Sequence, residues 1–165
     1  MKKIVLFLFL ISVIVISQNN NTYIIPNDAI RFRIIANSNS LVDQTNKSII
    51  KNEIQEELRK ILSKSYSKTL TKELIASNMN QIKTLVSAKT DDFDIKYGYN
   101  YFPKKEYRNV VYPAGEYESL VITLGSGLGD NWWCVLYPPL CFVDENEDIN
   151  NYDFYIKEIF NKIKI

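Results

Sequence analysis

Alternating hydrophobic and polar positions predict several β-strands, one near the start of the chain and the others in its second half. In residues 30–34 apolar and basic side chains alternate strictly, which is the period of a strand that faces a core at every second position. Further strands are predicted at residues 93–101, 110–112, 120–124 and 132–137. The last of these runs is continuously apolar and is followed by two prolines, while the run 110–112 is followed by a proline and 120–124 by a glycine.

Two amphipathic helices are predicted between the first strand and the others. In residues 43–63 apolar side chains such as Ile50 and Ile54 recur at helical spacing, with charged side chains on the other faces. Residues 71–89 show the same pattern, and residues 152–165 are expected to form a C-terminal helix. This order predicts an α+β fold: a single domain with a mainly antiparallel sheet, two consecutive amphipathic helices after the first strand and a C-terminal helix.

The N-terminus has the pattern of a segment for export. Lys2 and Lys3 precede an apolar run that ends at residue 16, and the chain then becomes polar. This run is shorter than the ~20 residues that span a bilayer, and a basic start followed by such a run is typical of a secretory signal peptide. We therefore expect three segments: residues 1–17 as a signal peptide or signal anchor, 18–27 as a polar linker and 28–165 as a domain outside the cytoplasm.

The composition limits the chemistry that this chain can perform. Its 165 residues include no histidine, which excludes Ser-His-Asp and Cys-His catalysis and histidine-ligated zinc. Basic residues number 20 against 19 acidic ones, so there is no basic surplus for nucleic acid. We expect no cofactor, no metal and no nucleic-acid partner. An enzyme would have to use carboxylate, lysine, tyrosine or thiol chemistry.

Three stretches suggest a ligand, but each has a simpler structural interpretation. Residues 125–129 read GSGLG and run into a strand rather than a helix, which favours a turn between strands over a phosphate-binding loop. Residues 144–148 begin like a calcium loop but lack its later glycine and glutamate, which favours a solvated acidic loop. The aspartates within residues 91–94 favour a polar entry to a strand over a catalytic carboxylate pair.

Cys134 and Cys141 leave three possibilities open. We favour a disulfide, because thiols outside the cytoplasm are commonly oxidised. Its ring of about eight residues would stabilise the fold by about 2.5 kcal/mol. They can also be free structural thiols. Cys134 as a nucleophile would lack a histidine base.

Three motifs carry a resemblance to a known family. Residues 112–118 read YPAGEYE, residues 123–141 read TLGSGLGDNWWCVLYPPLC, and residues 30–38 read IRFRIIANS and are followed by Asp43, Gln44 and Lys47. Over residues 26–143 the sequence resembles the stage II sporulation protein R family. The NWWCVLxPPLC core is long and of rare composition. Asn39 and Arg108 depart from the family pattern, where an acidic residue and a glycine are common.

The resemblance implies a signalling protein of endospore-forming bacteria. Such a protein is secreted across the forespore membrane into the intermembrane space, where it triggers a membrane-embedded aspartic-type protease to remove the pro-sequence of sigma-E. No catalytic residues are carried over from the family, so the chain is expected not to be an enzyme. The alternative is an extracytoplasmic hydrolase of cell wall or peptide, using a carboxylate pair or Cys134. A purely structural domain anchored by residues 1–17 is a third possibility.

The partner surface is expected in the segment 125–141. This segment combines a glycine-rich turn, two tryptophans and a loop that can carry a disulfide. Tyrosine and tryptophan are enriched in binding hot spots, although packing in the core would account for the same residues. We expect Trp132 or Trp133 to serve as the anchor if either is exposed. The candidate contact residues are Gly127, Asn131, Trp132, Trp133 and Tyr137.

Overall fold

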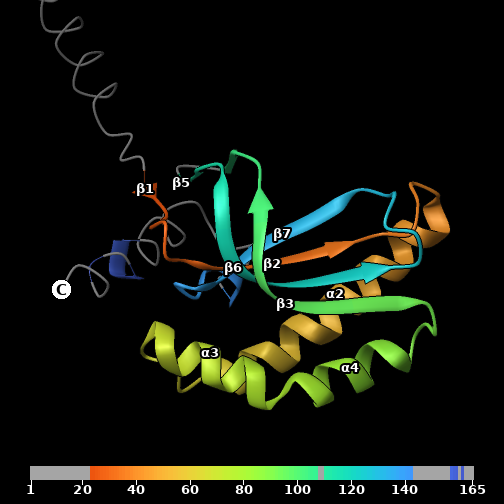
Figure 1. Ribbon diagram of the computed structural model, residues 1–165, viewed down its shortest axis with the longest axis horizontal. Helices are drawn as coiled ribbons and strands as arrows, with labels where there is room; N and C mark the ends of the chain where they lie inside the picture. Colours follow the sequence, from red (N-terminus) through yellow and green to blue (C-terminus); the bar gives the residue numbers. More distant parts are fainter. Residues whose placement is uncertain (1–22, 108–109, 143–156, 160, 162–165) are drawn as a thin grey trace, which may run out of the picture.

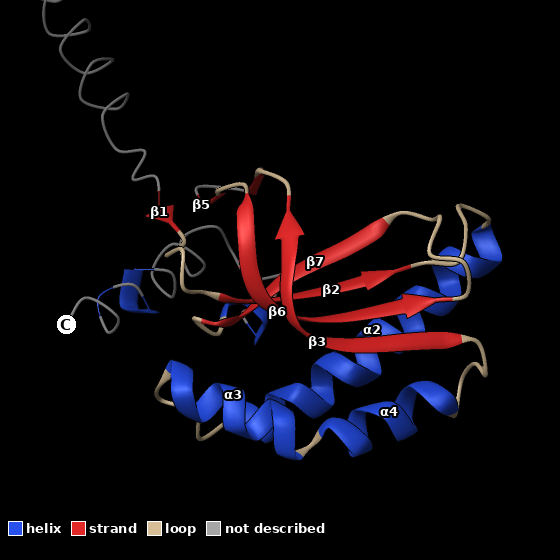
Figure 2. Ribbon diagram, viewed as in Figure 1, coloured by secondary structure: helices blue, strands red, loops and turns tan. Residues whose placement is uncertain are grey.

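The chain folds into a four-stranded sheet with three helices packed on one of its faces (Figure 1). The computed structural model describes residues 23–107, 110–142, 157–159 and 161. The helices form one layer and the sheet the other, and a second, smaller sheet lies at one end of the first (Figure 2). The predicted α+β fold is confirmed. The predicted signal segment and acidic loop lie outside the described residues, as does most of the predicted C-terminal helix, of which residues 157–159 are helical.

The main sheet has the strand order β3-β6-β2-β7. Its strands are β2 (Ile30–Ile35), β3 (Phe93–Phe102), β6 (Gly115–Leu124) and β7 (Asn131–Tyr137). The central strand β2 pairs parallel to β6 and antiparallel to β7, and β3 pairs antiparallel to β6 over its whole length. The sheet is therefore mainly antiparallel, and β3 and β7 are its two edges.

The smaller sheet has the order β1-β5-β4. It consists of β1 (Tyr23–Ile24), β5 (Val110–Tyr112) and β4 (Lys105–Tyr107). The sequence pattern did not predict β1 or β4. The stretch 18–27, predicted as a linker, thus contains a short strand, and Ile25 beside it is fully buried.

Helix α2 (Leu41–Leu62) begins at a side-chain cap. The hydroxyl of Ser40 accepts a hydrogen bond from the backbone N–H of Asp43 at 3.1 Å, which satisfies one of the free N–H groups of the first turn. Ile50, Ile54 and Leu58 are buried, as their spacing predicts, and they cover the sheet. This stripe joins the helix to the apolar face of β2.

The second predicted helix is divided into α3 (Lys68–Ser77) and α4 (Met79–Ser87). The break falls at Asn78, whose side-chain amide donates to the carbonyl of Leu74 at 2.8 Å. Asparagine side chains compete with the backbone for such hydrogen bonds, and this makes asparagine a poor residue within a helix. Three helices rather than two therefore follow the first long strand.

Strand β6 begins at Gly115, whereas the alternation of the sequence predicts a strand only from Leu120. The additional part of the strand includes Glu118, which is buried. The carboxylate of Glu118 accepts a hydrogen bond from the Tyr97 hydroxyl at 3.2 Å and lies 2.9 Å from the ammonium of Lys72. Charges are buried where they are paired, so this contact from α3 allows the strand to continue through an acidic residue.

Among the residues that the structure describes, no helix is both long and apolar enough to cross a membrane.

Candidate functional site

Two segments far apart in the sequence lie side by side at one end of the main sheet. They are the loop after β2 with the start of α2 (residues 36–47) and the glycine turn between β6 and β7 (residues 125–130), and together we call them the junction (Figure 1). The backbone N–H of Gly129 donates to the carbonyl of Ala36 at 2.9 Å, and that of Leu128 donates to Asn37 at 3.1 Å. The predicted glycine turn between strands is therefore present, and its contact with residues 36–39 is what builds this end of the molecule.

The side chain of Asn37 lies at the centre of the junction. Its carbonyl oxygen accepts from the backbone N–H and the hydroxyl of Ser126, both at 2.9 Å, and its amide donates to the carboxylate of Asp43 at 3.0 Å. The Ser38 hydroxyl also donates to Asp43, and this hydrogen bond holds the pKa of that carboxyl below its usual value. Asp43 is therefore ionised at neutral pH.

Further polar contacts fix the far side of the turn. The Asn39 side chain accepts from the backbone N–H of Asp130 at 2.7 Å, and the ammonium of Lys47 donates to the Asp130 carbonyl at 2.8 Å. The amide of Gln44 donates to the carbonyl of Ser38 at 2.9 Å. The Asn39 contact is one of the shortest hydrogen bonds of the junction.

Two of the glycines are required by this close approach. Gly125 has φ of +53°, and a Cβ there would lie 2.3 Å from the side-chain oxygen of Asn37. A Cβ on Gly129 would lie 2.3 Å from the carbonyl oxygen of Ser38. Any larger residue would separate the two segments.

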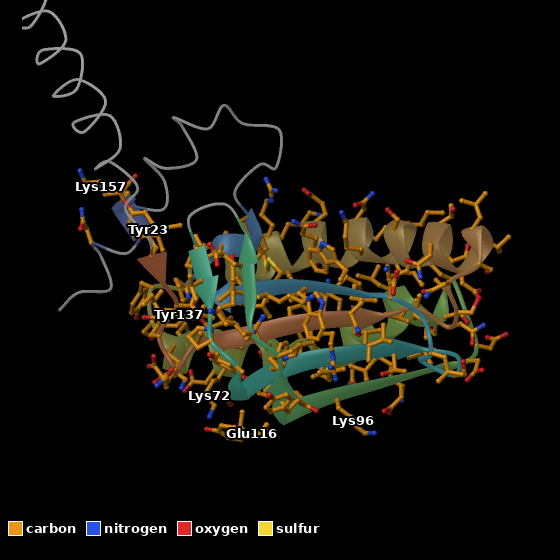
Figure 3. All side chains as sticks on the ribbon, turned by 90° about the horizontal axis from the view of Figure 1, so that it is seen from above. Tyr23, Lys72, Lys96, Glu116, Tyr137 and Lys157 are labelled. Atoms are coloured by element: carbon orange, nitrogen blue, oxygen red, sulfur yellow. A yellow bond between two sulfur atoms is a disulfide. The ribbon has the colours of Figure 1, made fainter. Side chains whose placement is uncertain are left out.

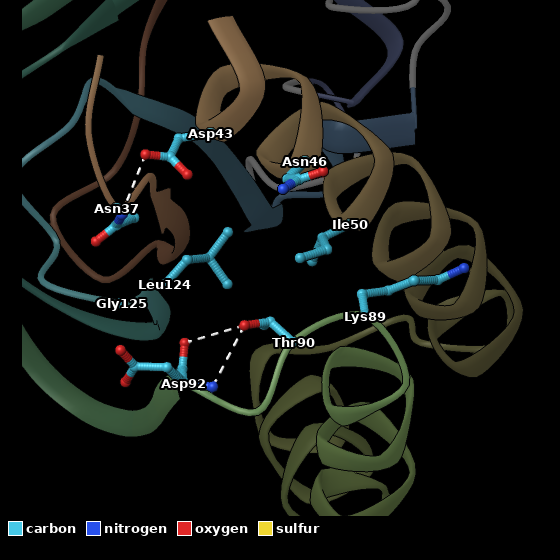
Figure 4. A pocket seen from close by; sticks show the side chains of 9 residues that line it. All are labelled: Asn37, Asp43, Asn46, Ile50, Lys89, Thr90, Asp92, Leu124 and Gly125. Atoms are coloured by element: carbon cyan, nitrogen blue, oxygen red, sulfur yellow. Dashed lines mark hydrogen bonds between the residues drawn. The ribbon is translucent and has the colours of Figure 1, made fainter. Parts of the chain in front are cut away.

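A hollow of about 180 Å³ lies beside the junction, between the start of α2 and the loop from α4 to β3 (Figure 4). Its floor contains the buried side chains of Ile50 and Leu124. The remaining lining residues are Asn37, Asp43, Asn46, Lys89, Thr90, Asp92 and Gly125. Asp92 thus lines a hollow as well as leading into β3, whereas Asp94 pairs with Lys96 at 2.7 Å.

Three large apolar side chains are exposed on the two segments of the junction. Leu41 and Leu128 are more than four-fifths exposed, and Val42 is 69 % exposed. The first two residues of α2 lie off the stripe that continues through Ile50, so a helical plot of the sequence places them on the solvent side. This signal was available in the sequence, and it was missed.

Comparisons with known proteins identify the family. The family model described as Stage II sporulation protein R matches residues 26–147, which include both segments of the junction. This chain belongs to the stage II sporulation protein R family. It is 38 % identical to the stage II sporulation protein R of Bacillus subtilis (strain 168) in an alignment of 133 residues, and this alignment covers 77 % of the chain and 59 % of that relative. No solved structure matches the chain.

The structure separates the five contact residues predicted for this family member. Gly127 lies in the junction and Asn131 follows it as the first residue of β7, whereas Tyr137, labelled in Figure 3, is the last residue of the same strand. Trp132 and Trp133 are neighbours on one strand and so point to opposite faces of the sheet. The five residues therefore do not form one continuous patch.

Each tryptophan is half-buried against its own face of the sheet. Trp132 lies on the helical face, where its ring packs edge-on against Phe32 at 5.5 Å and the ammonium of Lys51 lies 5.5 Å from its centroid. Trp133 packs on the other face, 5.2 Å from the Phe102 ring and 5.2 Å from the guanidinium of Arg33. Both rings support the fold, and each leaves part of its surface exposed.

Arg31 is buried on the same face as Trp133, although a basic residue in an alternating strand is expected to face solvent. Its guanidinium carbon lies 4.2 Å from the Phe102 centroid and 5.1 Å from that of Tyr117. Burial lowers the pKa of Arg31 to about 10, and its Nε and Nη1 have no hydrogen-bond partner in the described part of the chain. The aromatic rings thus hold this cation through their faces.

Cys134 and Cys141 form a disulfide, with their Cα atoms 5.5 Å apart. The bridge connects β7 to the short 3₁₀ helix Leu140–Phe142, and the side-chain amide of Gln55 on α2 donates to the Cys141 carbonyl. In this state the sulfur of Cys134 is bonded and is not a thiolate nucleophile. Within the described residues no three histidine, cysteine, aspartate or glutamate side chains are grouped to hold a metal.

Proposed function

We propose that this protein is an exported sporulation signal that activates a membrane-embedded protease by direct protein contact. The protease is of the aspartic type and removes the pro-sequence of sigma-E. Family membership supports a role in sporulation, and the basic and apolar N-terminus supports secretion across the forespore membrane into the intermembrane space. The protein acts there in free form or anchored by residues 1–17.

The junction is the surface that we assign to this contact. It combines the exposed apolar side chains Leu41, Val42 and Leu128 with a backbone held by hydrogen bonds between the two segments. Exposed apolar groups that gather on a rigid support are typical of protein-binding surfaces, because binding them orders little additional chain. Gly127 belongs to this surface, and Asn131 and Trp132 adjoin it at the start of β7.

Reconstitution tests the function. The purified protein is added to membranes that carry the protease, together with the pro-sigma-E substrate, and processing is followed by the size of the product. The added protein should begin at residue 18 rather than 28, because β1 and the buried Ile25 belong to the fold. Stimulated processing is expected. If the folded protein does not stimulate the protease, the proposed function is wrong.

A pair of matched variants tests the surface. Leu128→Ala removes an exposed apolar side chain at the junction, and Tyr66→Ala removes an equally exposed one in the loop between α2 and α3. We expect Leu128→Ala to raise the concentration for half-maximal processing about fivefold or more, equivalent to a loss of ~1 kcal/mol of contact energy. Tyr66→Ala should leave it unchanged. Equal effects of the two variants would place the contact elsewhere.

A further inference from the structure

Strand β3 forms a long edge of the main sheet. It pairs with β6 in ten consecutive residue pairs, from Phe93 to Phe102, without a register shift. On its other side no strand pairs with it within the described part of the chain. Figure 3 shows β3 along the border of the molecule, with the labelled Lys96 projecting outward from it. The backbone N–H and C=O groups of such an edge are available for pairing with another strand.

The opposite edge, β7, is protected. Its pairing with β2 contains a register shift between Ile30 and Arg31, and the disulfide attaches the 3₁₀ helix Leu140–Phe142 to this strand. Bulges and covering segments are two of the ways in which proteins protect a sheet edge. A charged side chain is another, but the ammonium of Lys96 on β3 is paired with the carboxylate of Asp94 at 2.7 Å. We therefore expect a further strand to be added at β3 rather than at β7.

Two exposed tyrosines on β3 show what a further strand would cover. Tyr99 and Tyr101 are 72 % and 59 % exposed. Side chains alternate along a strand, so both lie on the same face as Ile95 and Tyr97, which are partly buried against the main core. Aromatic side chains stabilise a strand pair when they lie opposite aromatic or β-branched side chains. The edge therefore presents apolar side chains as well as backbone groups to a partner strand.

We propose that β3 pairs with β3 of a second copy of this chain, in antiparallel orientation about a two-fold axis at Gly98. Opposed residues of neighbouring strands lie on the same face of a sheet, so the axis has to pass beside a residue of each strand. An axis at Tyr97 or at Gly98 gives the longest overlap of two ten-residue strands. At Tyr97 it would make the two Lys96 side chains diagonal neighbours, whereas at Gly98 it separates them by four residues of strand, about 14 Å.

The sequence of β3 is complementary to itself in this register. Tyr99 of one copy lies opposite Tyr97 of the other, and Tyr101 in the same way lies opposite Ile95. Each exposed tyrosine thus meets an aromatic or β-branched side chain, and no charged residue of β3 lies opposite its own kind. This complementarity favours a second copy over an unrelated strand, and it does not depend on the proposed function.

Disulfide trapping tests the register. Gly98→Cys places two thiols opposite each other at the axis, where the Cα atoms of facing residues are about 4.5–5.5 Å apart. A Cβ at this position meets nothing within 4 Å in its own chain, and the two native cysteines are already bridged to each other. Mild oxidation should therefore give a covalent dimer on a non-reducing gel. Asp94→Cys is the control, because its two copies would be eight residues of strand apart, about 27 Å. If both variants cross-link equally, or if neither does, the proposal is overturned.

Sedimentation measures the association without a cross-link. The protein from residue 18 should form a dimer with a dissociation constant on the order of 10 µM, because a single strand pair is a small interface. Tyr101→Lys puts a charge opposite Ile95 and should raise this constant about tenfold or more. Tyr66→Lys, in the exposed loop between α2 and α3, should not change it. Equal constants for the two variants would place the interface elsewhere. A protein that is monomeric yet stimulates processing would overturn this inference and leave the proposed function in place.

Discussion

Gly129→Ala gives the most direct test of the junction. The added methyl group would lie 2.3 Å from the Ser38 carbonyl oxygen and 2.8 Å from the Cβ of Ala36. Both neighbours belong to the loop that follows the central strand β2, and the N–H of Gly129 is itself bonded to the Ala36 carbonyl. Because backbone atoms cannot rotate aside as a flexible side chain can, the turn and the loop have to separate.

The cost of this substitution follows from the contact. Overpacking in a well-packed region destabilises by about 1–3 kcal/mol. The matched control is Gly98→Ala in β3, where a Cβ would meet nothing within 4 Å. Alanine restricts the unfolded chain, so at such a site it is neutral or stabilises by up to ~1 kcal/mol. The difference between the two variants is therefore expected to be about 1–4 kcal/mol.

Urea unfolding of the two variants, followed by tryptophan fluorescence, measures this difference. Gly129→Ala should unfold at a lower urea concentration with an unchanged slope, and its melting temperature should fall by about 3–12 °C. Gly98→Ala should unfold at the same concentration as the unmodified protein, or a higher one. If Gly129→Ala is as stable as Gly98→Ala, the close approach of the turn to Ser38 is not present in solution, and the assignment of the junction fails with it.

Three further predictions concern the disulfide, the buried arginine and the acid stability. The double variant Cys134→Ser, Cys141→Ser should lose about 2.5 kcal/mol of unfolding free energy relative to the oxidised protein, as measured by urea unfolding. If the variant is as stable as the oxidised protein, the bridge does not restrict the unfolded chain. Arg31→Met keeps the packing of the stem and removes a buried charge. In the same assay it should therefore lose less unfolding free energy than Arg31→Ala, by at least ~1 kcal/mol. Equal losses for the two variants would show that the contacts between the cation and the aromatic rings dominate. The pKa of Asp43 is lower in the folded protein than in the unfolded chain, so its contribution to stability is present above an unfolded pKa of ~3.9 and is lost as pH falls through the folded value. Unfolding between pH 5 and pH 2 (roughly the range where carboxyls titrate) should therefore depend less on pH in Asp43→Asn than in Asp91→Asn, and parallel curves would contradict this.

The main sheet was predictable because period two is a local property of the chain. Residues 30–34 and 93–101 became β2 and β3 within a residue or two. The same period implies that Trp132 and Trp133 point to opposite faces, so their separation could also have been inferred from the sequence. What the pattern could not show was which charged residues would be buried. Glu118 is buried because Lys72, from a helix distant in sequence, pairs with it.

The candidate site was only partly predictable, because its contacts join residues distant in sequence. Asn37 and Ser126 are 89 positions apart, and no local pattern indicates that an asparagine after one strand bonds to a turn before another. The sequence predicted the turn and the loop separately, and the family motifs marked both. The parallel pairing of β2 with β6 brings their ends to the same edge of the sheet, and this edge is where the two motifs meet.

The parallel pairing of β2 with β6 also explains why the junction and the hollow form one unit. Both strands end at the same edge, so the loop after β2 and the turn after β6 have to share the space above it. Asn37 fills this space, and its side chain links Ser126 of the turn to Asp43 of α2. The exposed Leu128 on the turn and the carboxylate of Asp43 in the hollow are thus held in fixed relation by one side chain. A partner that docks an apolar group on Leu128 therefore meets a loop and a turn that already hold a defined position relative to each other.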